Sequence, residues 1–357
     1  MTKPQMIRMS NPPSPPFSKG GLGGFKRILL PQPIEEEAMD LIKRSGYEIV
    51  LSPDARPETI QPLMKGVQGI ILRTGIKMTR ELMSHADDLW VISRTGAGVD
   101  NVDVQAATEL GILVTSVPGA NTKTVVEHTL ALILTLMKQI PLMDREVRRD
   151  NFNIRFKNIP RDLNGKTLGV VGLGRIGSEL ARICHQALGM RILTYDPYLT
   201  PEAQSSFRSW VEFCNMERLF RESDVISLHI PFSSETKKLI GAQYLNWMKP
   251  NAFLVNTSRG GVIDEKALIQ FLREKRIAGA GLDVFAQEPL EKDSPLKDLE
   301  NVILTPHTAA LTRECVIRLA VEATQTAIDV LGGKKPSEGI VNPEVFKQSR
   351  WKGFPSC

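Results

Sequence analysis

Residues Thr167–Arg182 read TLGVVGLGRIGSELAR, and this stretch decides the fold. The apolar run before the glycines predicts a buried β-strand, and a helical pattern follows from Arg175. Between the two, Gly172, Gly174 and Gly177 have the G-x-G-x-x-G spacing. In that pattern the first glycine permits a tight turn, the second lets a pyrophosphate approach the backbone, and the third lets the helix pack on the strand. We therefore expect a dinucleotide to bind here, with its phosphates at the N-terminus of the helix.

A second apolar run, Arg191–Asp196, follows this helix and ends at a carboxylate. Asp196 lies 19 residues after Gly177, a spacing at which a carboxylate holds the ribose diol of NAD. A carboxylate there also repels the 2′-phosphate of NADP, and no arginine directly follows Asp196. These residues therefore predict NAD as the cofactor. The alternative is that Asp196 is a plain turn residue before Pro197.

Short apolar runs alternate with helical patterns along the chain from Lys26. One series precedes a long helical pattern at about Thr122–Gln139, and a second series follows it. This βαβ alternation predicts parallel sheets covered by helices on both faces. The 357 residues therefore divide into two α/β units in succession. A last helix is expected at roughly Ala309–Leu331.

The composition, with 42% apolar and 24% charged residues, is typical of a folded globular protein. Residues 1–24 are rich in Pro, Gly and Ser without periodicity, so we expect them to be a disordered tail. Five of the 45 basic residues lie within residues 1–27, which contain no Asp or Glu. The rest of the chain therefore has 40 basic and 40 acidic residues. This balance argues against a nucleic-acid-binding face.

Cysteine usage and hydropathy bear on the compartment of the protein. The four cysteines are scattered without metal-ligand spacing and suit a reducing environment, so no metal site is expected. No apolar run approaches the roughly 20 residues that span a bilayer. The N-terminus lacks the apolar core of a secretory signal. We expect a cytoplasmic protein without a membrane partner.

Polar side chains follow three of the later apolar runs, at positions where a packed sheet does not need them. Arg259 follows the run FLVNTS, and His307 follows the run VILTP. Asp283 and Glu288 both lie in the segment GLDVFAQEP. Ligands of parallel α/β sheets bind beyond the carboxyl ends of the strands. We therefore expect these four residues to converge on one crevice.

Arginine, glutamate and histidine beside a nicotinamide suit hydride transfer to a carbonyl that is flanked by a carboxylate. Arg259 offers a fork of donors that matches a substrate carboxylate and polarises the neighbouring carbonyl. His307 can protonate the oxygen as the hydride arrives, or remove the hydroxyl proton in the reverse direction. If His307 begins a helix, the helix dipole favours the neutral imidazole, whereas Glu288 favours the imidazolium.

Each of these residues also has a plain structural interpretation. Arg259 could pair with an acidic surface residue, His307 could be structural, and Glu288 could be a solvated loop carboxylate. Their joint occurrence downstream of a dinucleotide turn favours catalysis. Among the other histidines, His128 is expected to be a packed or interdomain residue. His229 ends a strand and either borders the cofactor or simply packs.

Several long segments resemble the D-isomer-specific 2-hydroxyacid dehydrogenase family. They read GKTLGVVGLGRIG, LFRESDVISLHIPFSSETKKLIG, MKPNAFLVNTSRGGVIDEKAL, AGAGLDVFAQEPL and VILTPHTAALT. The resemblance covers about Lys26 to Phe346. ILRTGIKMTRELM and VISRTGAGVDNVDVQAA are most similar to the 3-phosphoglycerate dehydrogenase branch. The chain ends soon after GIVNPEVF, so we do not expect the regulatory C-terminal domain of many members of that branch, or feedback control by serine.

The resemblance implies an α/β fold with two domains, one Rossmann-like and one flavodoxin-like, each with a parallel sheet. The nucleotide domain, residues 121–306, would be inserted into a discontinuous substrate domain made of residues 25–120 and 307–346. Residues 1–24 and 347–357 would be tails. The long helix that begins near Thr122 would serve a subunit interface and give a homodimer.

The resemblance also implies catalytic and cofactor-binding residues. Arg259, Glu288 and His307 would form the catalytic set. Asp283 would hold the nicotinamide carboxamide. Further cofactor contacts would come from Gly172, Gly174, Arg175, Ile176, Gly177, Asp196, Ile230, Thr236, Thr257 and Ser258.

Substrate contacts are implied in the first half of the chain. The glycine-rich turn at Gly96, Ala97 and Gly98 would present backbone N–H groups to the substrate carboxylate, which suits a loop of small residues. Arg73 lies where the phosphoglycerate branch binds the phosphate of its substrate.

The implied activity is that of an oxidoreductase acting on CH-OH donors. It would transfer a hydride between NAD(H) and a small (R)-2-hydroxy acid or its 2-keto acid. 3-Phosphoglycerate, and with it serine biosynthesis, is the first candidate, and glyoxylate or hydroxypyruvate reduction is the alternative. A protein of a different class, an NAD-sensing binding protein or corepressor, would bind NADH tightly with negligible turnover on any 2-keto acid.

Overall fold

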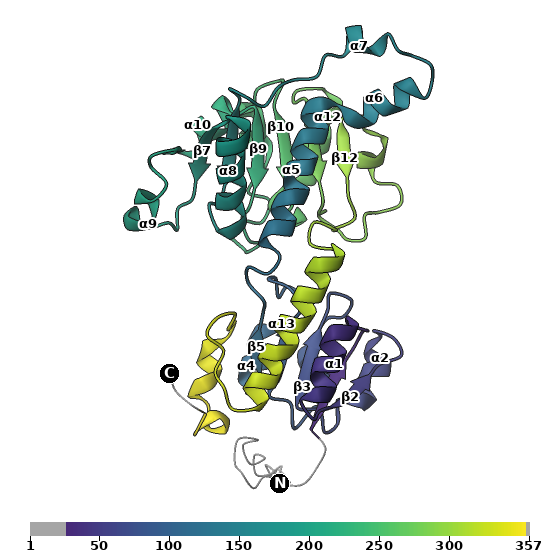
Figure 1. The fold of residues 1–357 in the computed structure, drawn as a ribbon, viewed down its shortest axis with the longest axis vertical. Helices are drawn as coiled ribbons and strands as arrows, with labels where there is room; N and C mark the ends of the chain where they lie inside the picture. The colour runs from purple at the N-terminus through teal and green to yellow at the C-terminus, as the bar shows by residue number, and fades with distance from the viewer. Residues whose placement is uncertain (1–25, 355–357) are drawn as a thin grey trace, which may run out of the picture. The chain divides into compact units, whose positions relative to one another are not determined.

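The computed structural model describes residues 26–354, which form two compact units. Unit 1 contains residues 26–121 and 313–354, and unit 2 contains residues 122–312 (Figure 1). This division confirms the predicted α/β fold with one domain inserted into another. The second crossing between units falls after Thr312, later than the expected boundary before His307. The expected tail at residues 1–24 lies outside the described residues.

Unit 1 is a five-stranded parallel sheet in the order β2-β1-β3-β4-β5. Its strands are β1 (Arg27–Leu30), β2 (Glu48–Leu51), β3 (Gly69–Leu72), β4 (Val91–Arg94) and β5 (Leu113–Thr115). Its helices are α1 (Glu36–Arg44), α2 (Pro57–Ile60), η1 (Gln61–Met64), α3 (Arg80–Met83), α4 (Val104–Glu109), α13 (Arg313–Leu331), η4 (Pro343–Lys347) and η5 (Ser349–Trp351).

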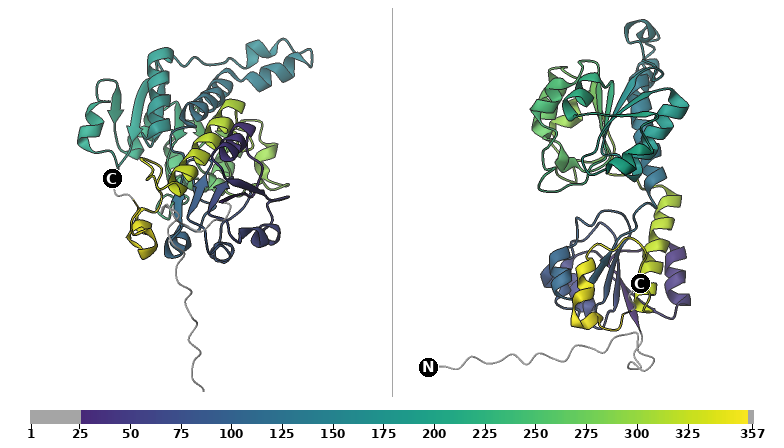
Figure 2. Two further views of the ribbon diagram at one scale, coloured as in Figure 1. Left: turned by 60° about the horizontal axis from the view of Figure 1, so that its bottom comes forward. Right: turned by 90° about the vertical axis from the view of Figure 1, so that its left-hand side faces the viewer.

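Helices cover both faces of this sheet (Figure 2). On one face α13 packs against α1, β3 and β4. On the other face Ile60, Leu82 and Ala106 of α2, α3 and α4 join the core that β1, β3, β4 and β5 form. Strands β3 and β4 are buried along their whole length, because a parallel sheet with helices on both faces leaves neither side to water.

The segment after residue 346 also packs on unit 1, although a tail was expected there. Trp351 is buried and its Nε1 donates a hydrogen bond of 2.9 Å to the carbonyl of Gly111. Its ring meets the edge of Trp90, with 5.2 Å between ring centroids, and a further ring contact joins it to Phe354. Aromatic burial of this kind outweighs the ordering entropy of a short segment.

Unit 2 is a seven-stranded parallel sheet in the order β12-β11-β10-β9-β6-β7-β8. Its strands are β6 (Thr167–Val171), β7 (Arg191–Tyr195), β8 (Val211–Phe213), β9 (Val225–Leu228), β10 (Phe253–Asn256), β11 (Gly279–Leu282) and β12 (Val302–Leu304). Its helices are α5 (Thr122–Lys138), α6 (Ile140–Val147), α7 (Ile154–Lys157), α8 (Arg175–Leu188), α9 (Pro201–Ser205), α10 (Met216–Glu222), α11 (Ala242–Trp247), η2 (Gly260–Val262), α12 (Glu265–Arg273) and η3 (Pro295–Asp298).

Two apolar layers hold the sheet of unit 2. Helices α5 and α8 pack on one face, where Leu132 and Leu180 are buried. Helices α10, α11 and α12 cover the other, where Phe220, Leu245 and Phe271 are buried. Strand order reverses at β6: β7 and β8 are added on one side of it, and β9 to β12 are added on the other. In such sheets the ligand crevice lies at this switch point, at the carboxyl ends of the strands.

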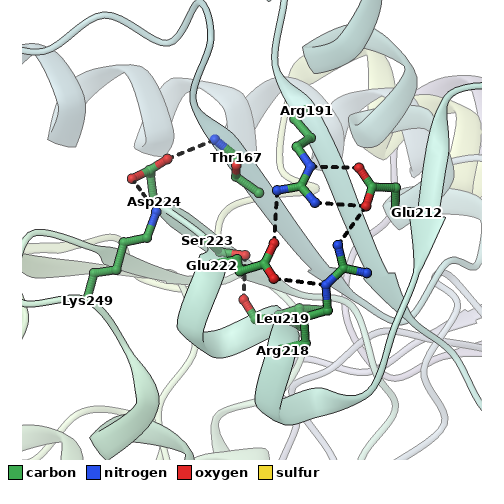
Figure 3. A network of polar contacts seen from close by, with 9 residues as sticks. All are labelled: Thr167, Arg191, Glu212, Arg218, Leu219, Glu222, Ser223, Asp224 and Lys249. Atoms are coloured by element: carbon green, nitrogen blue, oxygen red, sulfur yellow. Dashed lines mark hydrogen bonds and ion pairs between the residues drawn. The ribbon is translucent and has the colours of Figure 1, made fainter.

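A network of charged side chains lies near the amino end of β7, away from the carboxyl ends of the strands (Figure 3). Arg191, at the start of β7, binds Glu212 of β8 through two hydrogen bonds of 2.7 and 2.8 Å and Glu222 of α10 through a third. The hydrogen bond from Arg191 lowers the pKa of Glu212 to about 2, and Arg218 adds to the shift. These side chains are partly exposed, so each pair contributes little to stability. The network ties β8 to β7 and α10, away from the switch point.

No single helix of the described residues has the length and apolar content needed to cross a membrane, although α5 and α6 together do, with a bend of 55° between them. Within residues 26–354, no group of three His, Cys, Asp or Glu side chains is placed to hold a metal ion. Cys184, Cys214 and Cys315 form no disulfide bonds with one another.

Candidate active site

The glycine turn lies at the carboxyl end of β6, at the switch point of the sheet. Gly172 has a φ of +90°, and a Cβ added there would meet the carbonyl oxygen of His229 at 2.6 Å. A Cβ at Gly177 would collide with the backbone oxygen of Gly172. Both positions therefore require glycine, one for its conformation and the other for the close approach of helix to strand.

The N-terminus of α8 suits a phosphate. Gly174 is its N-cap residue, and a Cβ added to Gly174 would meet open space. No side chain of the described residues caps this helix, and its first turn carries no acidic residue. An anion is attracted by the helix dipole and by backbone N–H groups at such a site. The turn therefore fits the pyrophosphate of a dinucleotide.

Asp196 lies just beyond β7, next to the glycine turn. Its Oδ2 accepts a hydrogen bond of 2.8 Å from the N–H of Leu173, and its Oδ1 accepts one of 3.0 Å from the N–H of Tyr198. The carboxylate therefore holds the glycine turn as well as its own turn. Each carboxylate oxygen can accept a second hydrogen bond, so these contacts leave capacity for a ribose diol.

Glu288 and His307 come from different loops and meet in a hydrogen bond. Nδ1 of His307 lies 2.6 Å from Oε2 of Glu288, and Oε1 of Glu288 accepts from the N–H of Phe285 at 3.1 Å. A carboxylate is an acceptor, so Nδ1 of the imidazole carries the proton in this contact. Nε2 has no part in this contact, and the His307 side chain is 45% exposed.

Glu288 stays charged in this arrangement. Burial alone would raise the pKa of the Glu288 carboxyl, but the hydrogen bonds from His307 and from the N–H of Phe285, together with the charge of Arg259, outweigh burial and lower it. The turn that carries Arg259 packs on the loop that carries Glu288, because a Cβ added to the neighbouring Gly260 would collide with the backbone of Phe285. The structure thus brings Glu288 and His307 into contact and places the turn of Arg259 against the same loop.

Arg259 is presented by a turn after β10. The buried side chain of Asn256 donates from Nδ2 to the carbonyl of Arg259 at 2.9 Å, and its Oδ1 accepts from the N–H and hydroxyl of Ser258. Nη1 of Arg259 donates to the carbonyl of Ser258 at 2.7 Å. Asn256 was not singled out from the sequence. The available signal was a polar residue at the end of an apolar run.

His307 does not begin a helix, contrary to the expectation. The next helix, α13, begins only at Arg313, and His307 itself has a φ of +54°. Its N–H donates to the carbonyl of Asp283 at 2.8 Å. Because His307 lies outside a helix, the predicted effect of a helix dipole on its imidazole was wrong. The charged group in contact with the imidazole is the Glu288 carboxylate.

Asp283 has partners in the loop that carries His307. The carboxylate is fully buried and accepts hydrogen bonds from the hydroxyl of Thr305 and from the N–H groups of Thr308 and Ala309, at 2.6, 2.8 and 2.9 Å. This carboxylate therefore holds the loop of His307, and its contact with the nicotinamide carboxamide stays a prediction.

The other predicted cofactor residues surround the same edge of unit 2. Thr257 is buried and its hydroxyl lies 2.8 Å from that of Thr129 in α5. The hydroxyl of Thr236 donates to the carbonyl of Pro231 at 2.7 Å. Arg175 and Ile176 open α8, and Ile230 follows β9 and packs against the core. The hydroxyl groups of Thr257 and Thr236 bind other parts of the protein, and the cofactor contacts of these residues stay predictions.

His229 lies beside this edge and packs. Its Nε2 is 2.8 Å from the hydroxyl of Ser227, and its N–H donates to the carbonyl of Val171. Burial lowers the pKa of His229 to about 4, so the imidazole is neutral at physiological pH. The backbone of His229 packs against the glycine turn, and its neutral imidazole is not a proton donor to a substrate.

The predicted substrate residues belong to unit 1. Nη1 of Arg73 donates to Oε1 of Glu35 at 3.0 Å and to the carbonyl of Pro33 at 3.2 Å. Gly96 follows β4, its N–H donates to the carbonyl of Arg94, and a Cβ added there would meet the Arg94 guanidinium at 2.8 Å. Ala97 and Gly98 complete this turn, with Ala97 exposed.

Comparison with known proteins identifies the family. Residues 130–309 match the model described as "D-isomer specific 2-hydroxyacid dehydrogenase, NAD binding domain". The glyoxylate reductase of Korarchaeum cryptofilum is 37% identical over 90% of this chain and 97% of its own length. The chain belongs to the D-isomer specific 2-hydroxyacid dehydrogenase family. Unit 2 therefore contains the NAD-binding domain of that family.

Two further similarities are informative. The D-3-phosphoglycerate dehydrogenase of Methanocaldococcus jannaschii is 40% identical over 91% of this chain and 61% of its own length. This chain spans about three fifths of the length of the curated D-3-phosphoglycerate dehydrogenases it matches. The structure of an Aquifex aeolicus D-lactate dehydrogenase, complexed with NAD and lactic acid, has a TM-score of 0.77 and 30% identity over 86% of this chain and 96% of its own.

Proposed function

We propose that this protein is an NAD-dependent dehydrogenase that interconverts a small (R)-2-hydroxy acid and its 2-keto acid. The observation that carries the proposal is the 2.6 Å contact between Glu288 and His307 at the carboxyl edge of the NAD-binding sheet, where the turn of Arg259 packs on the backbone of Phe285. These groups suit a substrate that has a carboxylate next to a carbonyl. A guanidinium binds the carboxylate, and an imidazole that is oriented by a carboxylate exchanges a proton with the carbonyl oxygen.

Each of the three side chains has a distinct task in this proposal. NADH, when bound by the glycine turn, supplies the hydride. Arg259 binds the substrate carboxylate and polarises the adjacent carbonyl. His307 gives a proton from Nε2 to the carbonyl oxygen, and Glu288, which accepts from Nδ1, fixes the orientation of the ring. In the reverse direction His307 removes the hydroxyl proton.

Phosphoglycerate is the first candidate substrate, with Arg73 as the contact to its phosphate. The pairing of Arg73 with Glu35 supports an anion site, because Arg73 already holds a carboxylate there. A phosphate carries up to about two charges and three acceptor oxygens, so it can replace that carboxylate. The turn at Gly96, Ala97 and Gly98 would take the substrate carboxylate through the backbone N–H groups of Ala97 and Gly98, because the N–H of Gly96 donates to Arg94. Serine biosynthesis in the cytoplasm is the corresponding physiological role.

A second candidate is glyoxylate or hydroxypyruvate reduction. The glyoxylate reductase of K. cryptofilum is matched over nearly its whole length, unlike the phosphoglycerate dehydrogenases. Initial rates of NADH oxidation with phosphohydroxypyruvate, hydroxypyruvate, glyoxylate and pyruvate separate the two. A kcat/KM at least about tenfold higher for phosphohydroxypyruvate supports the first candidate. Tight NADH binding without turnover on any 2-keto acid would point instead to an NAD-sensing binding protein.

We also propose a homodimer, formed through the arm of residues 140–159 that follows α5. The apolar residues of helix α5 are largely buried inside unit 2, where the helix packs on α8, β10 and β11, so they are not the proposed interface. The arm, which Figure 1 shows extending from the rest of unit 2, carries strongly exposed apolar side chains. These are Ile140, Val147, Phe152, Phe156 and Ile159, each at least half exposed. Such a patch is typical of a protein interface.

Sedimentation velocity tests this interface. Phe152→Asp combined with Phe156→Asp should convert a dimer to a monomer, because two charges would be buried without partners. Leu51→Asp, at an exposed position of β2, is the matched control and should leave the dimer intact. A wild-type protein that sediments as a monomer at micromolar concentration would refute the dimer.

A further inference from the structure

His128 lies in α5 and has no task in the proposed reaction, yet it makes a specific polar contact. Its Nε2 is 3.0 Å from Oγ1 of Thr305 and 3.5 Å from Oδ1 of Asp283. Thr305 and Asp283 follow the ends of β12 and β11, on the way to the loop of His307. A histidine placed only for packing does not need such partners.

The hydrogen positions in this contact follow from the number of donors available. The hydroxyl of Thr305 donates to Oδ1 of Asp283 at 2.6 Å. A hydroxyl has only one hydrogen to donate, so toward His128 it must be the acceptor. Nε2 of His128 therefore carries a proton and donates it to Thr305. The result is a directional chain from His128 through Thr305 to the Asp283 carboxylate, and such chains polarise and strengthen one another.

The end of this chain sets the backbone that presents His307. The carboxylate of Asp283 accepts from the N–H groups of Thr308 and Ala309, and its backbone carbonyl accepts from the N–H of His307. His307 has a φ of +54°, in the left-handed region that residues other than glycine occupy rarely. A backbone in that region persists only when its surroundings hold it. The carbonyls of Asp283 and Thr305 hold the N–H of His307, and the buried Asp283 carboxylate holds the next two residues.

We propose that His128 is a positioning residue, which acts through Thr305 and Asp283 on the loop that carries His307. This inference rests on the proposed function for its kinetic consequence. When His128 donates to Thr305, the hydroxyl can only point at Asp283, and the carboxylate keeps a fixed orientation toward Thr308 and Ala309. Without that donor, the Thr305 hydroxyl is free to turn and the loop loses its fixed register. Small displacements of a catalytic group reduce rates strongly.

The kinetic test compares His128→Leu with His128→Gln. Leucine fills space without a donor, whereas glutamine can place an amide N–H near the position of imidazole Nε2. We expect His128→Leu to lower kcat by about 10- to 100-fold, with KM and the Kd of NADH within about twofold of wild type. His128→Gln should recover most of the loss. Thr305→Val should resemble His128→Leu, and the double variant should lose no more than either single one.

A second readout does not depend on turnover. Amide hydrogen exchange followed by mass spectrometry should show faster exchange of residues 305–311 in His128→Leu and wild-type exchange in His128→Gln. His185→Leu is the matched control. His185 contacts Trp210 and the carbonyl of Met190, away from the Asp283 contacts, so its loss should leave residues 305–311 unchanged.

The outcomes separate the inference from the proposed function. An active enzyme whose His128→Leu variant keeps kcat within twofold, or whose His128→Gln variant is as impaired as His128→Leu, would overturn the positioning role. A wild type without turnover, whose His128→Leu variant still shows faster exchange in residues 305–311, would support the positioning of the loop and refute the dehydrogenase. Unchanged exchange in that variant would overturn the inference whatever the activity.

Discussion

Nδ1 of His307 lies 2.6 Å from Oε2 of Glu288, although 19 residues separate them in the chain. The two loops that follow β11 and β12 bring them together. This contact fixes which imidazole nitrogen faces outward, so the Glu288 carboxylate determines the orientation of the proposed proton donor.

Glu288→Gln should lower kcat by about 100-fold or more, because the variant keeps the size of the side chain but loses the negative charge next to the proposed proton donor. The Kd of NADH should change little. Stopped-flow rates and NADH fluorescence titration measure the two effects. Glu291→Gln, on an exposed neighbour, is the control. Equal kcat values for both variants and the wild type would remove Glu288 from the mechanism.

Asp196→Asn should shift cofactor preference toward NADP by about 10- to 100-fold in the ratio of kcat/KM values, because a like charge beside the 2′-phosphate is removed. Asparagine is preferable to alanine here, since its oxygen can still accept from the N–H of Leu173 and support the glycine turn. Rates with NADH and NADPH measure the ratio. A wild type that already uses both cofactors equally would contradict the assigned role of this carboxylate.

Arg73→Ala should raise KM for phosphohydroxypyruvate by about 10- to 100-fold, the loss of charge-assisted hydrogen bonds to a phosphate. Glu35→Gln should have the opposite effect and lower that KM, because the carboxylate that occupies Arg73 becomes neutral. Glyoxylate, which has no phosphate, is the internal control, and its KM should stay within about twofold in both variants. Parallel changes for both substrates would exclude a phosphate contact.

His229 predicts a pH effect on stability. Its pKa is lowered from 6.5 to about 4 by burial. Between pH 4 and 6.5 the imidazole of His229 binds a proton in the unfolded chain but not in the folded chain. The free energy of unfolding therefore rises with pH across this range, and the contribution of His229 is lost on acidification from pH 6.5 to 4. His229→Gln should reduce this slope by at most about 1.4 kcal/mol per pH unit. Urea unfolding at pH 7.5, 6 and 5 measures it, with the exposed His85→Gln as control. Identical slopes for wild type and His229→Gln would show that the imidazole is not held neutral.

The parts of the fold that the sequence predicts well are those with long buried runs. Strands such as β6 and β10 are fully buried and read as continuous apolar segments. Strand β8 was missed, because it has three residues, Val211–Phe213, and lies at the edge of the sheet. Edge strands have only one neighbour and need little apolar sequence.

The same physics explains what could be predicted of the site. Polar residues after apolar runs predicted that Arg259, Glu288 and His307 share one edge, where the carboxyl ends of parallel strands meet, and Glu288 and His307 do make contact there. The contacts that Asn256 makes with Arg259, and Thr305 with His307, depend on the path of each loop. The periodicity of apolar residues does not predict that path. The path of the His307 loop in particular follows from hydrogen bonds to a buried carboxylate and not from helix formation.

The most direct test of the proposed proton donor is a comparison of wild type with His307→Gln under saturating NADH and 2-keto acid. Loss of NADH absorbance measures turnover, and NADH fluorescence measures binding. We predict that the variant loses about 100- to 10,000-fold in kcat, while the Kd of NADH stays within about twofold, because a proton donor is removed and no cofactor contact is lost. A variant that turns over as fast as the wild type would contradict the central claim that His307 carries the proton.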